Sequence, residues 1–361
     1  HTQELTQRLQ AKQSEGTGRG APHAMLAALL GYATEHPAAT QLLGNESLAA
    51  GEDAARAHDD LLQTLGATFT STDAKATRYL VAPDVLLNGV LRMLQPPLQA
   101  GETTVERFLD DIAAWLSRYE LAPDAAELQP TVLAHTPAPR FLPEPPLLAP
   151  KPLSPGRRVL PQGEINRNRR ERILYATAQA VTDCGYLEVT VDDIVARAQI
   201  ARRAFYQHFE DTDAAFLATL EFFSQPLLAA TAGAFFSTRP WPQRILAALE
   251  ALLNFLSHYP AIAHALLIDS PAAGQAAARS IHATERALML LLEEGFNESA
   301  SEPPPRLAAE LTIATVMGLA NQRLRTEQAD RLPRQLPGFA VLVLAPFLGA
   351  EAAGDFIRTQ L

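Results

Sequence analysis

An internal repeat constrains the fold of this chain more than any other feature of its sequence. The segment MLAALLGYATEHPAATQLL at 25–43 aligns within ILAALEALLNFLSHYPAIAHALL at 245–267, in register from Leu26 with Leu249 and with a constant shift of 223 positions. The matches at this shift are Leu26 and Leu249, Pro37 and Pro260, Gly51 and Gly274, and the Ala-Ala-Arg triplets at 54–56 and 277–279. Chance does not predict prolines, glycines and a triplet at one shift, so the sequence indicates a duplicated domain.

The repeat resumes after a short insertion around SASEPPP, where Gly89 lies opposite Gly318 and RFLDDIAAWL lies opposite GFAVLVLAPFL. Both copies have apolar residues at helical spacing and few alternating β-branched runs, a pattern that favours helices over strands. The predicted fold class is therefore all-α, built on two copies of one helical domain.

A proline-rich linker separates the two copies. Eleven of the 27 prolines lie between Pro123 and Pro161. Because proline has no amide hydrogen and breaks helices, this segment is expected to be semi-extended. Such a tether leaves the two copies free to pair with each other inside one chain.

The segment that follows the linker differs from the rest in charge. The whole chain has a net charge of −10, but residues 151–210 carry 10 basic and 7 acidic side chains. This is the only positive segment, and its sign suits a local anion-binding face.

A helix-turn-helix pattern occupies this basic segment. NRRERILYATAQAVTDCGY at 168–186 predicts a helix ended by Gly185, and Thr190 with Asp193 predicts a capping box that starts a second helix. A third helix is expected from about Ala201. The residues expected to face inward are Ile173, Thr177, Ala180, Val181, Val191, Ile194, Val195, Ala198, Phe205 and Phe209, which leaves Arg202, Arg203, Tyr206 and His208 facing outward. The second helix of such a pair lies in the major groove, where arginine can bond guanine O6 and N7.

Residues 168–217 resemble the DNA-binding domain of the TetR family of bacterial transcriptional regulators. The likeness lies in RILYATAQAVTDCGY, VTVDDIVARAQIARRAFYQHF and DAAFLATL. It implies a helical domain that dimerises and binds an effector, and DNA-contacting positions at Thr190, Arg202, Arg203, Ala204, Tyr206 and His208. Two residues depart from the family pattern: Gln199 replaces the usual glycine of the turn, and Thr212 replaces a usual lysine. We expect strain at Gln199 if the turn needs positive φ, and the loss of one phosphate contact at Thr212.

These features divide the chain into four segments: copy 1 at 1–122, the linker at 123–165, the helix-turn-helix domain at 166–223, and copy 2 at 224–361. Family repressors are two-fold dimers, so we interpret the chain as two fused protomers and expect a counterpart of 166–223 upstream of His1. The predicted pseudo-dimer interface is an intramolecular four-helix bundle of segments 84–95, 103–119, 306–325 and 336–349.

Each copy has the composition for an apolar pocket that takes a hydrophobic effector, and we expect one dominant site, in copy 2. The candidate lining residues are Leu249, Leu253, Leu256, Leu266, Leu288, Val316 and Met317. His264, His282 and Glu285 are candidates to orient a ligand. The alternative for each residue is an ordinary place in the core or in a structural hydrogen bond.

Other classes of protein are less well supported. No nucleophile–base pair, metal-ligand spacing or phosphate-binding loop stands out, so we expect no enzyme, metal or cofactor. No apolar run reaches the length of a membrane span, and the single Cys184, expected to be buried, excludes an intrachain disulfide. The sequence therefore favours a cytoplasmic regulator that binds operator DNA, and repression, which needs only operator occupancy. The alternatives are a protein–protein adaptor with the same fold and a small-molecule sensor with no DNA role.

Overall fold

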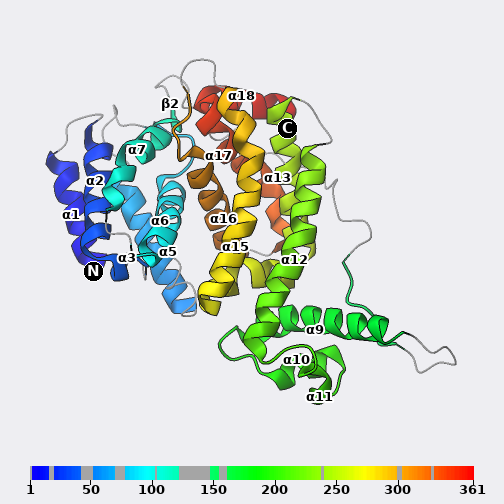
Figure 1. The fold of residues 1–361 in the computed structure, drawn as a ribbon. Helices are drawn as coiled ribbons and strands as arrows, with labels where there is room; N and C mark the ends of the chain where they lie inside the picture. The colour runs from blue at the N-terminus through cyan, green and yellow to red at the C-terminus, as the bar shows by residue number, and fades with distance from the viewer. Residues whose placement is uncertain are drawn as a thin grey trace.

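The computed structural model describes residues 2–15, 20–41, 52–69, 78–101, 104–121, 147–153, 161–236, 240–298, 303–326 and 329–361. Within these ranges the protein is helical (Figure 1), which confirms the all-α prediction. The described β-structure is one antiparallel pair of two-residue strands, β1 (Arg78–Tyr79) and β2 (Glu120–Leu121).

The N-terminal half contains six helices and one 3-10 turn among its described residues. They are α1 (Thr2–Glu15), α2 (Gly20–Glu35), α3 (Pro37–Gln41), α5 (Glu52–Phe69), α6 (Pro83–Gln99), η2 (Val105–Phe108) and α7 (Leu109–Ser117). Pro83 starts α6 at a position where the missing amide hydrogen costs nothing.

The C-terminal half begins with α9 (Gln162–Cys184), α10 (Val191–Ala198) and α11 (Arg202–Phe205), which lie together at one end of the molecule (Figure 1). From there the long helix α12 (Thr212–Phe235) runs up to the body of the molecule. The body continues with α13 (Trp241–His258), α14 (Pro260–His264), the π-helix η3 (Ala265–Asp269), η4 (Ser270–Ala273), α15 (Gly274–Met289), η5 (Leu290–Asn297), α16 (Ala308–Thr326), η6 (Ala329–Gln335), α17 (Leu336–Leu348) and α18 (Ala350–Gln360).

The helix bounds of the two halves follow the sequence repeat. A shift of 223 residues carries the bounds of α3 onto those of α14, and it carries α5 onto a range that overlaps α15. Gly89 lies in α6 and its repeat mate Gly318 lies in α16. Helices therefore occur at the compared positions in both halves, while the duplication itself stays a prediction.

Helices α6 and α16 make the most extensive helix contact of the described chain, and both glycines lie where they cross. A Cβ added to Gly89 would lie 1.7 Å from Thr315 Oγ1, and one added to Gly318 would lie 3.0 Å from Asn88 Nδ2. Helix α16 also contacts α7 and α17. Glycine at both positions thus allows the two backbones to approach closely.

The predicted segment boundaries need two corrections. The boundary between 223 and 224 is not a break, because α12 runs through it as one helix and its apolar side chains pack on α9, α13 and α15. In the predicted linker, 123–146 and 154–160 lie outside the described residues. Residues 147–153 have no regular structure, with the Leu147 amide donating to Tyr259 Oη at 3.0 Å, and α9 already begins at Gln162.

By length and composition, α12 is apolar enough to cross a membrane. Half of that apolar stretch is buried inside the protein. Its packing between the helix-turn-helix and the helical body accounts for this composition.

Candidate nucleic-acid interface and ligand cavities

The first two helices of the basic segment end and begin where the sequence predicts. Gly185 follows α9 with φ of +82°, and its amide donates to Val181 O at 2.8 Å. Ile173, Thr177, Ala180 and Val181 are buried, as predicted. The short segment after Gly185 then leads directly to Thr190, the N-cap of α10.

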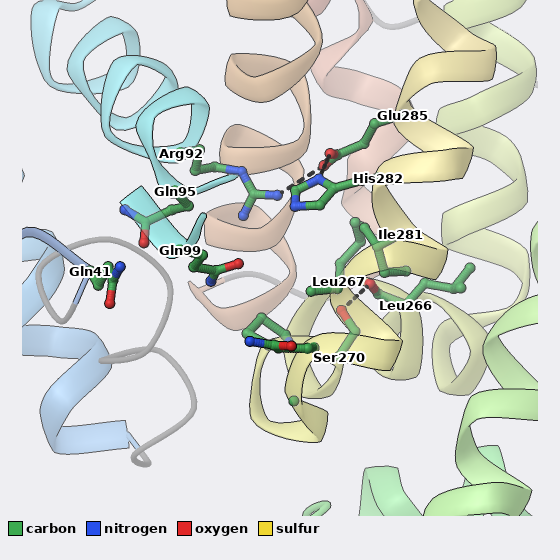
Figure 2. Close-up of a pocket in the computed structure, with 14 residues that line it drawn as sticks. Gln41, Arg92, Gln95, Gln99, Leu266, Leu267, Ser270, Ile281, His282 and Glu285 are labelled. Atoms are coloured by element: carbon green, nitrogen blue, oxygen red, sulfur yellow. Dashed lines mark hydrogen bonds and ion pairs between the residues drawn. The ribbon is translucent and has the colours of Figure 1, made fainter. Parts of the chain in front are cut away.

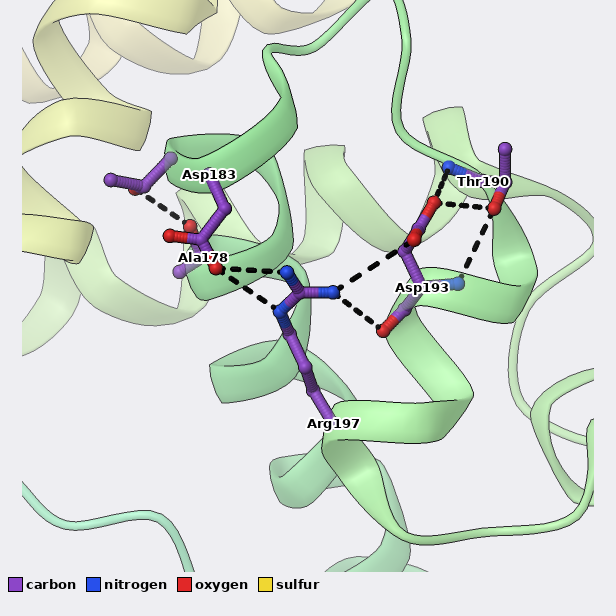
Figure 3. Close-up of polar contacts among 6 residues, drawn as sticks. Ala178, Asp183, Thr190, Asp193 and Arg197 are labelled. Carbon is purple, nitrogen blue, oxygen red and sulfur yellow. Dashed lines mark hydrogen bonds and ion pairs between the residues drawn. The ribbon is translucent and has the colours of Figure 1, made fainter.

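The capping box that starts α10 is complete (Figure 3). The Asp193 amide donates to Thr190 Oγ1 at 3.3 Å, and the Thr190 amide donates to Asp193 Oδ2 at 3.0 Å. The hydrogen bond from the Thr190 side chain lowers the pKa of Asp193. Because the amide and hydroxyl of Thr190 both contact Asp193, the phosphate contact expected of Thr190 requires this arrangement to open.

Arg197 joins α10 to α9. Its guanidinium donates to Asp183 Oδ2 at 2.8 Å and to Asp193 O at 3.1 Å (Figure 3). The hydrogen bond with Asp183 raises the pKa of Arg197. This contact links the two helices.

The turn after α10 does require positive φ, and Gln199 provides it with φ 52° and ψ 47°. It is the one non-glycine residue with positive φ in the described part of the chain. The buried Arg172 of α9 donates to Gln199 O at 2.8 Å and also to Ala198 O. Burial lowers the pKa of Arg172, with a smaller effect from the charge of Arg169. Arg172 thus satisfies the carbonyls at the turn, a role that sequence reasoning missed.

Helix α11 is shorter than the third helix that the sequence predicts. It covers Arg202–Phe205, so Tyr206 and His208 lie in the turns that follow it. Phe205 and Phe209 are buried, as predicted. The predicted inner face of α10 is confirmed at Ile194 and Ala198, while Val191 and Val195 are half-buried.

The exposed side of α11 carries two arginines in different states. Arg202 NH1 pairs with both oxygens of Asp192, at 3.0 and 3.1 Å, and its guanidinium lies 6.0 Å from the Tyr206 ring. Arg203 is exposed and has no hydrogen bond or ion pair with the described residues. Tyr206 is 49% exposed and Ala204 is half-buried. Arg203 is therefore the side chain most available to an external acceptor.

His208 does not face outward as predicted. It is half-buried, and its Nε2 atom is buried with no hydrogen-bond partner among the described residues. Burial lowers the pKa of His208, and the charges of Arg169 and Arg170 lower it further. The run RNRRER at 167–172 in the sequence could have indicated these arginines. Arg169 and Arg170 extend the basic surface beyond α11.

Residues Asp211 and Thr212 account for one departure from the family pattern. Asp211 is the N-cap of α12, and its Oδ1 accepts from the Ala214 amide at 2.7 Å. Thr212 is the first residue of that helix. The acidic stretch EDTD therefore starts α12, since acidic side chains stabilise a helix N-terminus.

The apolar pocket predicted in copy 2 is a cavity of about 30 Å³. That volume equals about one water molecule's share of the liquid. Of the seven predicted residues, Leu249, Leu288, Val316 and Met317 line it, among others. Leu253 and Leu256 are buried in the core and line neither this cavity nor the two larger ones of the described chain, and Leu266 lines a different one.

The larger cavities lie between α6 of the N-terminal half and α15 of the C-terminal half. One has a volume of about 270 Å³ and the other about 530 Å³. Arg92, His282 and Glu285 line both cavities, and Figure 2 shows them in the smaller one. The expectation of one dominant site inside copy 2 is thus wrong for the volumes in this structure, because the helix core of copy 2 is closely packed.

The wall between these cavities is an ion-paired group. Arg92 NH2 lies 3.2 Å from Glu285 Oε1, and His282 Nδ1 lies 2.8 Å from Glu285 Oε2. Burial alone would raise the pKa of Glu285, but the hydrogen bond with His282 and the charge of Arg92 lower it overall. The third candidate polar residue, His264, bonds Asp269 Oδ2 at 2.6 Å instead.

Cys184 is exposed at the end of α9, contrary to the expectation of a buried thiol. Its position next to Gly185, at the open end of the helix, explains this exposure.

Comparison with known proteins matches residues 173–219 to the domain model described as bacterial regulatory proteins, tetR family. The HTH-type transcriptional activator FasR of Mycolicibacterium smegmatis is 32% identical to this chain over 90 residues. That alignment covers 25% of this chain and 41% of the relative, so the chain spans less than half of the relative's length.

Two solved structures are similar over about half of this chain. The fatty acid degradation regulator FadR from Bacillus halodurans is 14% identical, with a TM-score of 0.42, over 48% of this chain and 94% of that one. The TetR family regulator PfmR from Thermus thermophilus is 18% identical, with a TM-score of 0.39, over 48% and 97%. The domain match at 173–219, with its capped helix-turn-helix, shows that these residues are similar to the DNA-binding domain of the TetR family of bacterial regulatory proteins.

Proposed function

We propose that this regulator binds duplex DNA through α10 and α11 and that a small molecule controls this binding. The observation that carries the proposal is the exposed Arg203, which has no ion pair among the described residues and lies on a helix that a capped α10, a buried Arg172 and two buried phenylalanines hold in place. An arginine on such a helix can donate two hydrogen bonds to guanine in the major groove. Thr190, Arg202, Ala204 and Tyr206 remain proposed contacts, whereas the inward position of His208 does not favour the contact predicted for it.

The charges around α11 lower the affinity for DNA that we propose. Arg202 must leave Asp192 before it contacts DNA, and the phosphates would repel the Asp192 carboxylate. The positive charge of Arg169 and Arg170 on α9 favours the phosphate backbone without reading sequence. We therefore assign base reading to α11 and orientation to the arginines of α9.

We also propose that the two halves are fused protomers that pair as the subunits of a family dimer would. Three hydrogen-bonded contacts between the halves support this. Trp115 Nε1 donates to Thr312 Oγ1 at 3.2 Å, Tyr119 Oη donates to Leu342 O at 2.8 Å, and Arg325 pairs with Asp59 at 3.0 Å. The contacts of α16 with α6 and α7, and the hydrogen bond from Tyr119 to Leu342 of α17, support the predicted bundle.

The proposed site of action is bacterial cytoplasmic DNA. We expect repression where the operator overlaps a promoter and activation where the operator lies upstream of it. A reporter gene would distinguish the two outcomes. The curated relative from M. smegmatis is an activator by its name.

Selection from a random duplex library with the whole chain tests the proposal. We expect an enriched sequence with a guanine whose preference weakens in Arg203→Ala. The matched control is Arg331→Ala, an exposed arginine on η6, which should leave the preference unchanged. If no sequence is enriched and the chain does not retain DNA at low salt, the protein is a non-DNA-binding adaptor or sensor with this fold.

A further inference from the structure

The smaller cavity between the halves is built by both of them. Gln95 and Arg92 of α6 lie on one side, and Ser270, Ile281 and His282 of η4 and α15 lie on the other (Figure 2). Its volume of about 270 Å³ is close to the lower end of the range for small-molecule sites. Neither half contains this site alone.

Gln95 places an unsatisfied acceptor in the cavity wall. The side chain is 1% exposed, and its Nε2 donates to Leu91 O at 2.9 Å and to Thr40 O at 3.4 Å. Because both partners of Nε2 are acceptors, the amide orientation is fixed and the other atom must be the oxygen. Oε1 is buried and has no donor among the described residues. A buried acceptor without a donor is costly, so a ligand N–H or O–H at this point would be favourable.

The remaining lining fixes the charge of a suitable ligand. Arg92 and Glu285 neutralise each other, and His282 is hydrogen-bonded to Glu285. The other polar side chains in the wall are uncharged, namely Gln41, Gln99, Gln275 and Ser270. Leu266 and Ile281 provide an apolar surface beside them. The chemistry suits an uncharged molecule with a hydrogen-bond donor and one apolar edge.

The cavity is next to an unusual helix that contacts the DNA-binding segment. Leu266 and Leu267 of the π-helix η3 line the cavity, and η3 also packs against α9 and α12. His264 and Asp269 bond each other across η3 at 2.6 Å, and Asn321 Nδ2 donates to Leu267 O at 2.5 Å. π-Helices are rare and occur frequently at functional sites. The five-residue helix η3 therefore contacts both the cavity and α9.

We propose that this inter-half cavity is the effector site, that it takes an uncharged small molecule donating a hydrogen bond to Gln95 Oε1, and that occupancy changes operator affinity through η3. This inference rests on the proposed DNA binding, and it names the ligand class and the place of the control. A ligand can act here only if it binds more tightly to one position of η3 than to another.

Chemical filling of the cavity tests the proposal without knowledge of the natural ligand. Replacing the single cysteine (Cys184→Ser) allows one new thiol in the wall, Ala278→Cys, to be alkylated alone. Iodoacetamide adds an uncharged amide with two N–H donors, and iodoacetate adds a carboxylate of nearly the same size with none. Ala276→Cys, exposed on the same helix and outside the cavity wall, is the matched control.

At Ala278→Cys we expect the amide label to change operator affinity about tenfold, as typical coupling energies imply. The amide-labelled protein should also melt at a higher temperature than the carboxylate-labelled one. Neither difference should occur at Ala276→Cys, and Gln95→Leu should abolish the difference between the two labels. Gln275→Cys, also in the wall, serves if Ala278→Cys does not fold.

Equal operator affinity and equal melting temperature for the two labels at Ala278→Cys and at Gln275→Cys would overturn the effector site. That result is distinct from failure of the proposed function, because there the unlabelled protein itself would not bind operator DNA.

Discussion

At the scale of single residues, Gln199 is the point where the helix-turn-helix departs most clearly from the TetR pattern. The turn needs positive φ, which glycine adopts freely and glutamine does not. Arg172 satisfies the two carbonyls at this turn, so the surrounding structure holds Gln199 in an unfavourable conformation.

Gln199→Gly should therefore stabilise the protein by about 0.5–1 kcal/mol, because the relief of αL strain exceeds the entropy that glycine adds to the unfolded chain. Chemical denaturation would measure the change. The matched control is Gln207→Gly, at an exposed turn residue without positive φ, which should be neutral or destabilising. A stabilised control and an unchanged Gln199→Gly would contradict the strain.

His208 predicts a pH dependence of stability. Its pKa in the folded protein is lowered from 6.5, chiefly by burial, so the unfolded chain binds the proton more tightly. Stability from this group is therefore full above about pH 6.5 and decreases as the pH falls from there through the lowered pKa.

His208→Asn should remove the part of the decrease that begins near pH 6.5, measured as the free energy of unfolding against pH. His23→Asn, a more exposed histidine on α2, is the control and should leave the profile unchanged. Identical profiles for the wild type and His208→Asn would show that this imidazole is not responsible.

At the scale of helices, the crossing of α6 and α16 depends on glycine. In Gly89→Ala the new methyl would overlap Thr315, whose Oγ1 donates to Leu311 O inside α16, so one backbone must move. We expect a loss of about 1–3 kcal/mol in thermal or chemical unfolding, the range typical of overpacking.

Gly31→Ala provides the control for this substitution. Gly31 also lies inside a helix, α2, but nothing among the described residues lies within 4 Å of its added Cβ. Alanine should stabilise that helix by up to about 1 kcal/mol. If both variants change stability by the same amount and sign, close approach of α6 and α16 is not needed.

Helix positions follow from the sequence where local rules decide them. The capping box at Thr190, the end of α9 at Gly185 and the buried faces of α9 and α11 depend on spacing within a few residues, and the structure confirms them. The length of α11, the inward position of His208 and the pairing of Arg202 with Asp192 depend on contacts between helices, and the sequence does not predict them.

The cavities show the same difference between features that depend on local spacing and features that depend on contacts between helices. The sequence identifies an apolar core in copy 2, but it does not distinguish close packing from a cavity. The two larger cavities form where α6 meets α15, at positions such as Arg92 and Glu285 that lie far apart in the chain. Periodicity describes one face of one helix and does not tell how two distant helices fit together. The sequence therefore indicates His282 and Glu285 as candidates but not their partner Arg92.

At the scale of the whole molecule, an ion pair contributes to the contact between the two halves. Arg325 forms a two-pronged ion pair with Asp59, both mostly buried, and Asn321 Oδ1 accepts from Arg325 Nε at 2.9 Å. The tether between the halves keeps their mutual concentration at roughly millimolar. We therefore expect pairing within one chain to be favoured over pairing between chains.

Cutting an inserted protease site between residues 123 and 146 tests this pairing. We expect both fragments to remain together at micromolar concentration, with a mass near the 39.1 kDa of the intact chain by light scattering. Arg325→Met with the same cut should dissociate more readily, because it leaves the buried Asp59 unpaired. Fragments that separate at once would contradict a large interface.

Titration of the whole chain with its selected duplex tests the central claim, specific DNA reading by α11, most directly. The affinities for that duplex and for a scrambled one are compared at physiological salt. The account predicts a preference of about a thousandfold or more for the selected duplex, the lower end for specific DNA-binding proteins. Arg203→Ala should weaken binding to the selected duplex by about 1–3 kcal/mol and leave scrambled DNA almost unaffected. Equal affinity for the two duplexes, or equal losses on both in Arg203→Ala, would contradict the account.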